Sequence, residues 1–126
     1  MPIEDVRKHV LERVNAYRFG HRLPALALHE DESRACKAHA EHLAAESGRL
    51  GHLYTAPSAD HLRPGWRENV VASPDAEFEA AVDRLVWRSL SKPEHARAVR
   101  EAKTHFAADV AVDRVAGRVF LVMRFR

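Results

Sequence analysis

The last quarter of the chain carries the pattern that most constrains the fold, because apolar residues there occupy every second position. Such alternation is typical of a β-strand. An apolar run over residues 106–112 and a turn near Ala116-Gly117 precede it, which predicts a pair of neighbouring antiparallel strands. The alternating apolar residues of the closing strand are Val119, Leu121, Met123 and Phe125.

Helical patterns dominate the first half of the sequence. Apolar residues at intervals of three and four predict an amphipathic helix up to about Phe19, which Gly20 ends. The alanine-rich segment 30–47 predicts a second helix with Gly48 as its stop, and the residues between the two helices read as a connection. Residues 48–67 then form a long loop.

The middle of the chain predicts one strand and two further helices. Asn69–Ala72 is the strand candidate, and Ser73-Pro74 has the composition of a helix start. Ser91 and Glu94 have the spacing of a capping box, which predicts a short fourth helix. The order α-α-β-α-α-β-β predicts an α+β domain spanning 1–126, in which helices cover an antiparallel sheet.

Composition excludes several classes of function. The 20 basic and 18 acidic side chains leave a formal charge of +2 and the arginines are spread along the chain, so nucleic acid is not an expected partner. No apolar stretch approaches the roughly 20 residues of an integral membrane segment. Residues 1–5 lack the basic start and apolar segment of a signal peptide. Cys36 is the only cysteine, which excludes an internal disulfide, and we expect it in the core.

Three residues at the ends of predicted elements form the candidate site. His52 follows Gly51 after a helix, Glu68 opens an apolar run, and His95 lies in the first turn of another helix. Two imidazoles and a carboxylate in one cleft could bind a divalent metal or transfer a proton. The alternatives are a loop role for His52 and a structural role for Glu68, as an acceptor of backbone N–H groups.

The order of motifs resembles the CAP superfamily, which includes cysteine-rich secretory proteins, antigen 5 and plant pathogenesis-related proteins. The chain is most similar to the short bacterial SCP-like members, which lack disulfides. The resemblance covers nearly the whole chain. It rests on Val14–Arg18, Leu23–Leu26, Ala35–Ala40, Gly51-His52, Arg67–Val70, the segment Trp87–His95 and the strand Val119–Val122.

This resemblance implies a three-layer α-β-α sandwich with a small antiparallel sheet and a central cavity. It implies a metal site, for zinc in some members, at the positions of His52, Glu68 and His95, and sterol or lipid binding in other members. The sequence departs from the family pattern twice. Arg67 replaces a glycine, and the position of the second cavity glutamate is Leu90.

Three further residues complete the candidate ligand site. Glu94 could stand in for the missing glutamate, and Trp66 could line or cover the cleft. Trp87 is expected in the core or the cavity wall, with a binding platform as the alternative. The family resemblance also implies an extracellular or cell-envelope location. Since no signal peptide is seen, a cytoplasmic location stays open.

Two functions from different classes fit these residues. The first is a monomeric binding module that holds a divalent metal, a small molecule or a lipid-like ligand. The second is a metal-dependent, peptidase-like hydrolase, with Glu68 or Glu94 as the base. No nucleophile stands out, because Ser91 is better explained as a helix cap, and we assign no catalytic residue. A purely structural or protein-interaction domain is the third reading.

Overall fold

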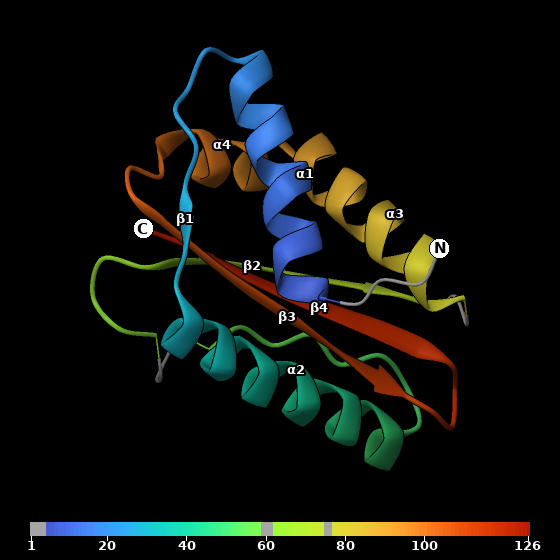
Figure 1. The fold of residues 1–126 in the computed structure, drawn as a ribbon. Coiled ribbons are helices and arrows are strands. Elements are labelled where there is room, and N and C mark those ends of the chain that lie inside the picture. The colour runs from blue at the N-terminus through green and yellow to red at the C-terminus, as the bar shows by residue number, and fades with distance from the viewer. Residues whose placement is uncertain (1–4, 59–61, 75–76) are drawn as a thin grey trace.

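A four-stranded mixed sheet separates two helical layers (Figure 1). The computed structural model describes residues 5–58, 62–74 and 77–126. The strands lie in the order β1-β3-β4-β2. The elements along the chain are α1 (Val6–Gly20), β1 (Ala27–Leu28), α2 (Glu30–Leu50), β2 (Arg67–Ser73), α3 (Phe78–Ser91), α4 (Pro93–Glu101), β3 (His105–Asp113) and β4 (Arg118–Phe125).

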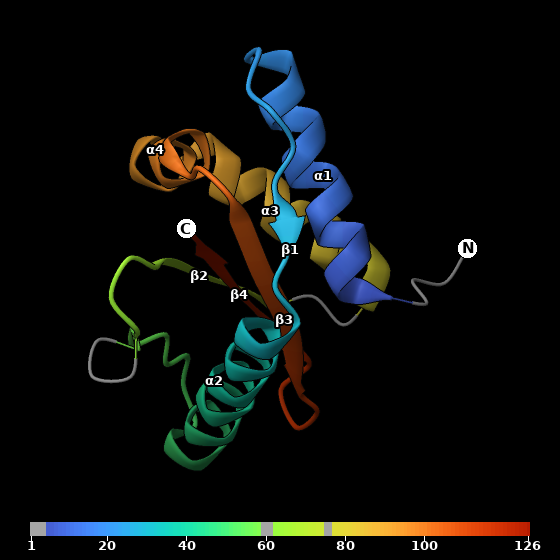
Figure 2. The same ribbon diagram turned by 60° about the vertical axis from the view of Figure 1, so that its left-hand side comes forward.

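The helices are divided unequally between the two faces of the sheet. In Figures 1 and 2, α2 lies on one face, and α1, α3 and α4 lie on the other. The predicted α+β sandwich is therefore confirmed. The sheet differs from the purely antiparallel one expected, because Ala27 and Leu28 pair in parallel with His105 and Phe106. These two strand residues lie in the segment that the sequence pattern assigned to a connection.

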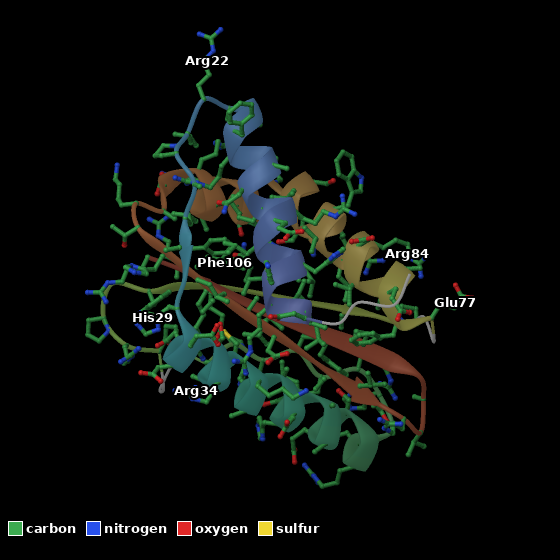
Figure 3. All side chains as sticks on the ribbon, in the orientation of Figure 1. Arg22, His29, Arg34, Glu77, Arg84 and Phe106 are labelled. Atoms are coloured by element: carbon green, nitrogen blue, oxygen red, sulfur yellow. The ribbon has the colours of Figure 1, made fainter. Side chains whose placement is uncertain are left out.

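Each interlayer space holds its own apolar core. The larger core joins α1, α3 and α4 to the sheet and includes Val14, Leu85 and Phe106. Phe106 lies in the interior in Figure 3, and its ring centroid is 5.1 Å from that of Phe125. The smaller core joins α2 to the sheet and contains Cys36, which is fully buried as predicted. Burial raises the pKa of the Cys36 thiol, so it is an unreactive core residue.

The Asn-x-x-Arg motif of α1 has a structural role. The Asn15 side chain accepts a hydrogen bond from the Leu26 N–H at 2.8 Å and donates to the Leu26 carbonyl at 3.1 Å. Arg18 is 1% exposed and donates to the carbonyls of Val99 at 2.6 Å and Ala102 at 3.0 Å. The second of these carbonyls belongs to the residue that caps α4. Asn15 and Arg18 therefore fix the entry to β1 and the end of α4 against α1.

The end of α2 lies later than the sequence pattern predicts. Gly48 remains helical, and the helix continues to Leu50. Gly51 takes the left-handed conformation with φ 74°, and its N–H donates to the Ser47 carbonyl at 3.0 Å. A left-handed residue of this kind favours glycine and ends a helix, so Gly51 is the stop that was assigned to Gly48.

The starts of α3 and α4 also differ from the predictions. Ser73 pairs with Val119 as the last residue of β2, and α3 begins at Phe78, so Ser73-Pro74 does not start it. Residues 75–76 lie outside the described residues. Pro93 begins α4 as expected, but the side chain of its N-cap residue, Lys92, makes no capping hydrogen bond. The Ser91 hydroxyl instead donates to the Trp87 carbonyl at 2.8 Å, at the end of α3.

Candidate functional site

The structure brings two of the three predicted site residues to one cavity. Glu68 of β2 and His95 of α4 line a cavity of about 570 Å³, together with Trp66 and Glu94. His52 is not among the residues that line it. The His52 side chain is exposed, and its Nδ1 atom lies 3.2 Å from the Leu53 carbonyl oxygen.

Glu68 and His95 approach this cavity from opposite faces of the sheet. The Glu68 side chain points toward α2, the layer from which Glu32 joins the same ionic network. The next residue, Asn69, points the other way and donates from Nδ2 to the His95 carbonyl at 3.2 Å. Because β2 is the edge strand of the sheet, the cavity extends around its edge and reaches both side chains.

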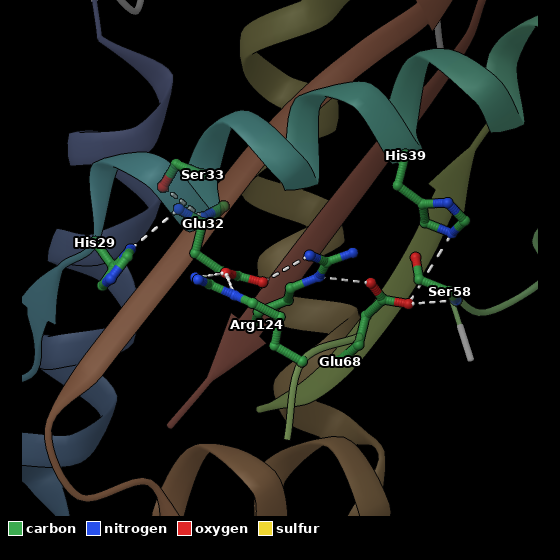
Figure 4. A network of polar contacts seen from close by, with 9 residues as sticks. His29, Glu32, Ser33, His39, Ser58, Glu68 and Arg124 are labelled. Atoms are coloured by element: carbon green, nitrogen blue, oxygen red, sulfur yellow. Dashed lines mark hydrogen bonds and ion pairs between the residues drawn. The ribbon is translucent and has the colours of Figure 1, made fainter. Parts of the chain in front are cut away.

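The Glu68 carboxylate already has protein partners on both oxygens (Figure 4). Its Oε2 atom accepts from the Arg124 Nε atom at 2.8 Å, and its Oε1 atom accepts from the Ser58 N–H at 2.9 Å. The side chain of Glu68 is 4% exposed. The structural role that the sequence left open for Glu68, as an acceptor of a backbone N–H, is thus present in the structure.

Arg124 lies between two buried carboxylates. Besides Glu68, it donates to the Glu32 Oε1 atom at 2.7 Å, and Arg63 donates from Nε to the Glu32 Oε2 atom at 2.9 Å. Burial alone would raise the pKa of Glu32, but the hydrogen bonds and charges of Arg124 and Arg63 outweigh it, and that pKa lies below its usual value. Glu32 therefore remains ionised at neutral pH.

Hydrogen bonds from three side chains hold the segment 54–58, which follows α2, against the rest of the protein. The Ser47 hydroxyl accepts from the Tyr54 N–H at 2.8 Å and donates to the Tyr54 carbonyl at 3.3 Å. The His39 Nε2 atom lies 2.9 Å from the Ala56 carbonyl oxygen. With the Glu68–Ser58 bond, alternate residues of this segment are hydrogen-bonded to the protein, and the last of these bonds joins the segment to the cavity-lining Glu68.

His39 extends the buried network beyond Glu68. Its Nε2 atom lies 4.0 Å from the Glu68 Oε1 atom. Burial lowers the pKa of His39, partly offset by the charge of Glu68. The Ser58 hydroxyl is buried beside them, without a hydrogen-bond partner in the described part of the chain. Since an imidazole nitrogen facing a carbonyl must be the protonated one, His39 donates from Nε2 to Ala56.

The surroundings of His95 favour a neutral, hydrogen-bonded imidazole over a charged one. Its Nδ1 atom lies 3.3 Å from the Ser89 hydroxyl oxygen, and Ser89 is fully buried. Burial lowers the pKa of His95, the nearby Lys92 charge lowers it further, and Glu94 opposes them. The ring is therefore neutral at pH 7. The structure records no hydrogen bond from its Nε2 atom to the residues it describes.

A cation does not fit the donors as they are arranged. Both oxygens of Glu68 are occupied, and one of their partners is the positively charged Arg124, which would repel a metal ion. Within residues 5–58, 62–74 and 77–126, no group of three or more His, Cys, Asp or Glu side chains is placed to hold a metal. A zinc site at His52, Glu68 and His95 stays a prediction.

The two tryptophans differ sharply in position. Trp66 is 5% exposed and lines the cavity, where its ring centroid lies 5.3 Å from that of His29. Trp87 is 72% exposed on α3 and is not a lining residue, so its assignment to the core or cavity wall is wrong. It lies on the outer side of a helix whose buried stripe includes Val82 and Leu85.

Sequence reasoning missed the partners of Glu68. Arg124 lies on the opposite face of β4 from Met123, in a strand whose other residues from Val119 to Phe125 are apolar. Glu32 and His39 lie on one side of α2, where the alanine-rich pattern drew attention to small residues instead. A charged residue inside an apolar strand was the feature that could have indicated a buried ion pair.

Comparison with known proteins identifies the family. An outer surface protein from Borrelia burgdorferi is similar in structure, with a TM-score of 0.69 and 12% sequence identity over 99% of this chain and 94% of that chain. A comparison with curated proteins found no significant match. The model of the CAP, or cysteine-rich secretory protein, family matches residues 11–123. The chain therefore belongs to the CAP, or cysteine-rich secretory protein, family.

Proposed function

We propose that this protein is a binding module, and that the cavity at the edge of β2 holds a small organic ligand with at least one hydrogen-bonding group. The observation that carries the proposal is the meeting of Trp66, Glu68 and His95 in one cavity of about 570 Å³. A cavity of this size is within the range of small-molecule sites. Trp66 supplies an apolar wall, and neutral His95 supplies a hydrogen-bonding group.

The charges around the cavity favour an uncharged or weakly polar ligand. Arg124 neutralises Glu68, while Arg67 and Arg97 on the rim both pair with Glu101. An anionic ligand would therefore meet no unpaired cation among the described lining residues, and the Glu94 carboxylate would repel it. This balance supports the small-ligand form of the predicted binding module over the metal form. A lipid-like molecule fits only through its polar end, because most side chains lining the cavity are polar.

The hydrolase alternative gains no support from the same geometry. Ser89 contacts His95 but is fully buried, so its hydroxyl is not presented to a substrate. Both oxygens of Glu68 accept hydrogen bonds from the protein, so this carboxylate is not presented as a base. The location outside the cell or in the cell envelope remains a proposal from the family resemblance. Among the described residues, no helix has the length and apolar character to cross a membrane.

The test is a fragment screen by NMR on uniformly ¹⁵N-labelled protein, with zinc chloride and decanoate as separate probes. We expect uncharged polar fragments to shift the indole N–H of Trp66 and the side-chain amide of Asn69. A His95→Phe variant should lose these shifts, and the matched His52→Phe variant should keep them. A screen in which no fragment perturbs these resonances would refute the proposal. Stoichiometric zinc that both histidine variants lose would establish the metal site instead.

A further inference from the structure

The edge of β3 that β1 leaves uncovered supports an inference about a second site, separate from the cavity beside β2. β1 pairs with β3 only at His105 and Phe106, whereas β3 continues to Asp113. β4 lies along the other side of β3 from Phe106 to Asp113. Within the described chain, the outer edge of β3 from Ala107 onward therefore has no strand beside it.

The register shows which main-chain groups point to this edge. His105 donates to the Arg126 carbonyl at 3.1 Å and accepts from the Arg126 N–H at 3.0 Å. Hydrogen-bonded and non-bonded pairs alternate along an antiparallel ladder. Residues 107, 109, 111 and 113 therefore bond to β4, and residues 108, 110 and 112 direct their N–H and C=O groups outward. The bond from His29 N–H to the Phe106 carbonyl, 2.8 Å long, agrees with this alternation.

Side chains cap the outward groups over only part of the edge. The Ala108 N–H donates to the Ser33 hydroxyl at 3.2 Å, and the Val110 carbonyl accepts from the Lys37 Nζ atom at 2.7 Å. The Val110 N–H donates at 2.8 Å to the carboxylate of the residue before it. No partner is recorded for the N–H or C=O of Val112 among the described residues. Val112 is 37% exposed, so the edge is open there.

A groove of about 940 Å³ lies on both sides of this opening. On the α2 side its wall includes the small residues Ala44, Ala45 and Gly48, with Lys37 and Glu41 beside them. On the opposite face of the sheet its wall includes Phe78 and Val119, which belong to the larger core or pack against it. A strand added here would direct alternate side chains to the two faces. Each set would then meet an apolar wall.

We propose that the β3 edge around Val112 binds an extended peptide of a partner protein, which adds a strand to the sheet and places apolar side chains in both halves of the groove. Strand addition of this kind uses main-chain hydrogen bonds for affinity and side-chain pockets for specificity. A fatty acyl chain could fill the groove but offers nothing to the Val112 N–H and C=O. Lys37, Glu41 and Arg114 place both signs of charge around the groove, so the peptide needs no large net charge.

The test uses a pool of synthetic peptides of about seven residues, with Val, Ile, Thr, Phe or Tyr at alternating positions. The matched probe is the same pool with N-methyl groups on alternate backbone nitrogens, which removes the donors that would pair with β3. Binding is followed by ¹H–¹⁵N NMR of the full chain. We expect the unmethylated pool to shift the amides of residues 110–115 and to slow hydrogen exchange at Val112, and the methylated pool to bind at least about tenfold more weakly.

Two variants separate strand pairing from apolar contact. Val112→Pro removes an N–H that bonds to no other strand, so it should fold and lose peptide binding. Ala45→Arg fills the α2 half of the groove and should also weaken binding, whereas Phe19→Ser, which removes an exposed aromatic side chain elsewhere, should not.

Several results would overturn the proposal. They are absence of shifts at millimolar peptide, equal binding of the methylated pool, and displacement of the peptides by decanoate. Concentration-dependent self-association that shifts the Val112 amide without peptide would assign the edge to a second copy of this chain instead.

Discussion

Glu68 and Arg124 occupy directly opposed positions on β2 and β4, and the Arg124 Nε atom donates to the Glu68 Oε2 atom over 2.8 Å. The same guanidinium donates to Glu32 of α2 at 2.7 Å. These three side chains are between 2% and 4% exposed. One cation therefore binds two buried carboxylates and joins the sheet to α2. The main role of this network is structural, although Glu68 also lines the candidate site.

Arg124→Met should destabilise the protein strongly. The substitution leaves two carboxylates buried without their shared cation, and the loss of one partner from a buried ion pair costs about 3–5 kcal/mol. Urea unfolding followed by circular dichroism measures this change. The control is Arg49→Met, which removes an exposed, solvent-screened pair with Glu46 and should change the free energy of unfolding far less. Equal effects of the two substitutions would show that the buried network contributes little.

Glu68→Gln separates the structural role of this residue from a ligand role. The amide keeps the shape but loses the charge that Arg124 faces, so we expect a loss of about 1–3 kcal/mol in the free energy of unfolding without any metal present. The loss should be the same after addition of zinc chloride. A variant as stable as the parent without metal, but unable to bind zinc that the parent binds, would contradict the structural role and support the metal site.

Stability should fall at acid pH through Glu32. Burial alone would raise the pKa of Glu32, but hydrogen bonds from Arg124 and Arg63 outweigh it, so this pKa is lowered in the folded state. A carboxylate of this kind contributes stability that is fully present above its unfolded pKa of about 4.3 and is lost as pH falls through the lower, folded pKa. Urea unfolding from neutral pH to about pH 3 should show this decline. The Glu32→Gln variant should show a shallower decline, and an unchanged slope would exclude Glu32 as its source.

Local patterns predicted the elements better than their connections. The alternation at Leu121 and the three- and four-residue spacing around Val14 depend only on neighbouring residues, so strands and helices emerged from the sequence. β1 did not, because two residues paired with His105 and Phe106 carry no periodic signal. For a similar reason, the sequence did not predict the ion pair between Arg124 and Glu68. The two are 56 residues apart, and only the register of β2 against β4 places them together.

The candidate site was predicted in part for a similar reason. Motif positions pointed to Glu68 and His95, and both line the cavity. They could not show that the two side chains come from opposite faces of the sheet, because this depends on which residues of β2 face each side. Nor could they place His52, since the path of a long loop is set by tertiary hydrogen bonds such as those of Ser47 and His39.

Ser47→Ala should loosen the segment 54–58, which is hydrogen-bonded to Glu68 through Ser58. The Ser47 hydroxyl is buried and makes hydrogen bonds with both the N–H and the carbonyl of Tyr54. Its removal therefore takes a hydrogen-bond partner from two main-chain groups. Hydrogen exchange at the Tyr54 amide should accelerate at least about fivefold, which corresponds to about 1 kcal/mol for a neutral hydrogen bond. Ser91→Ala is the matched control, because Ser91 is exposed and, among the described residues, its hydroxyl bonds only to the Trp87 carbonyl. It should leave exchange at Tyr54 unchanged. If exchange at Tyr54 is equally slow in both variants, the segment is held by its other contacts, such as those of His39 and Glu68, and Ser47 does not stabilise it.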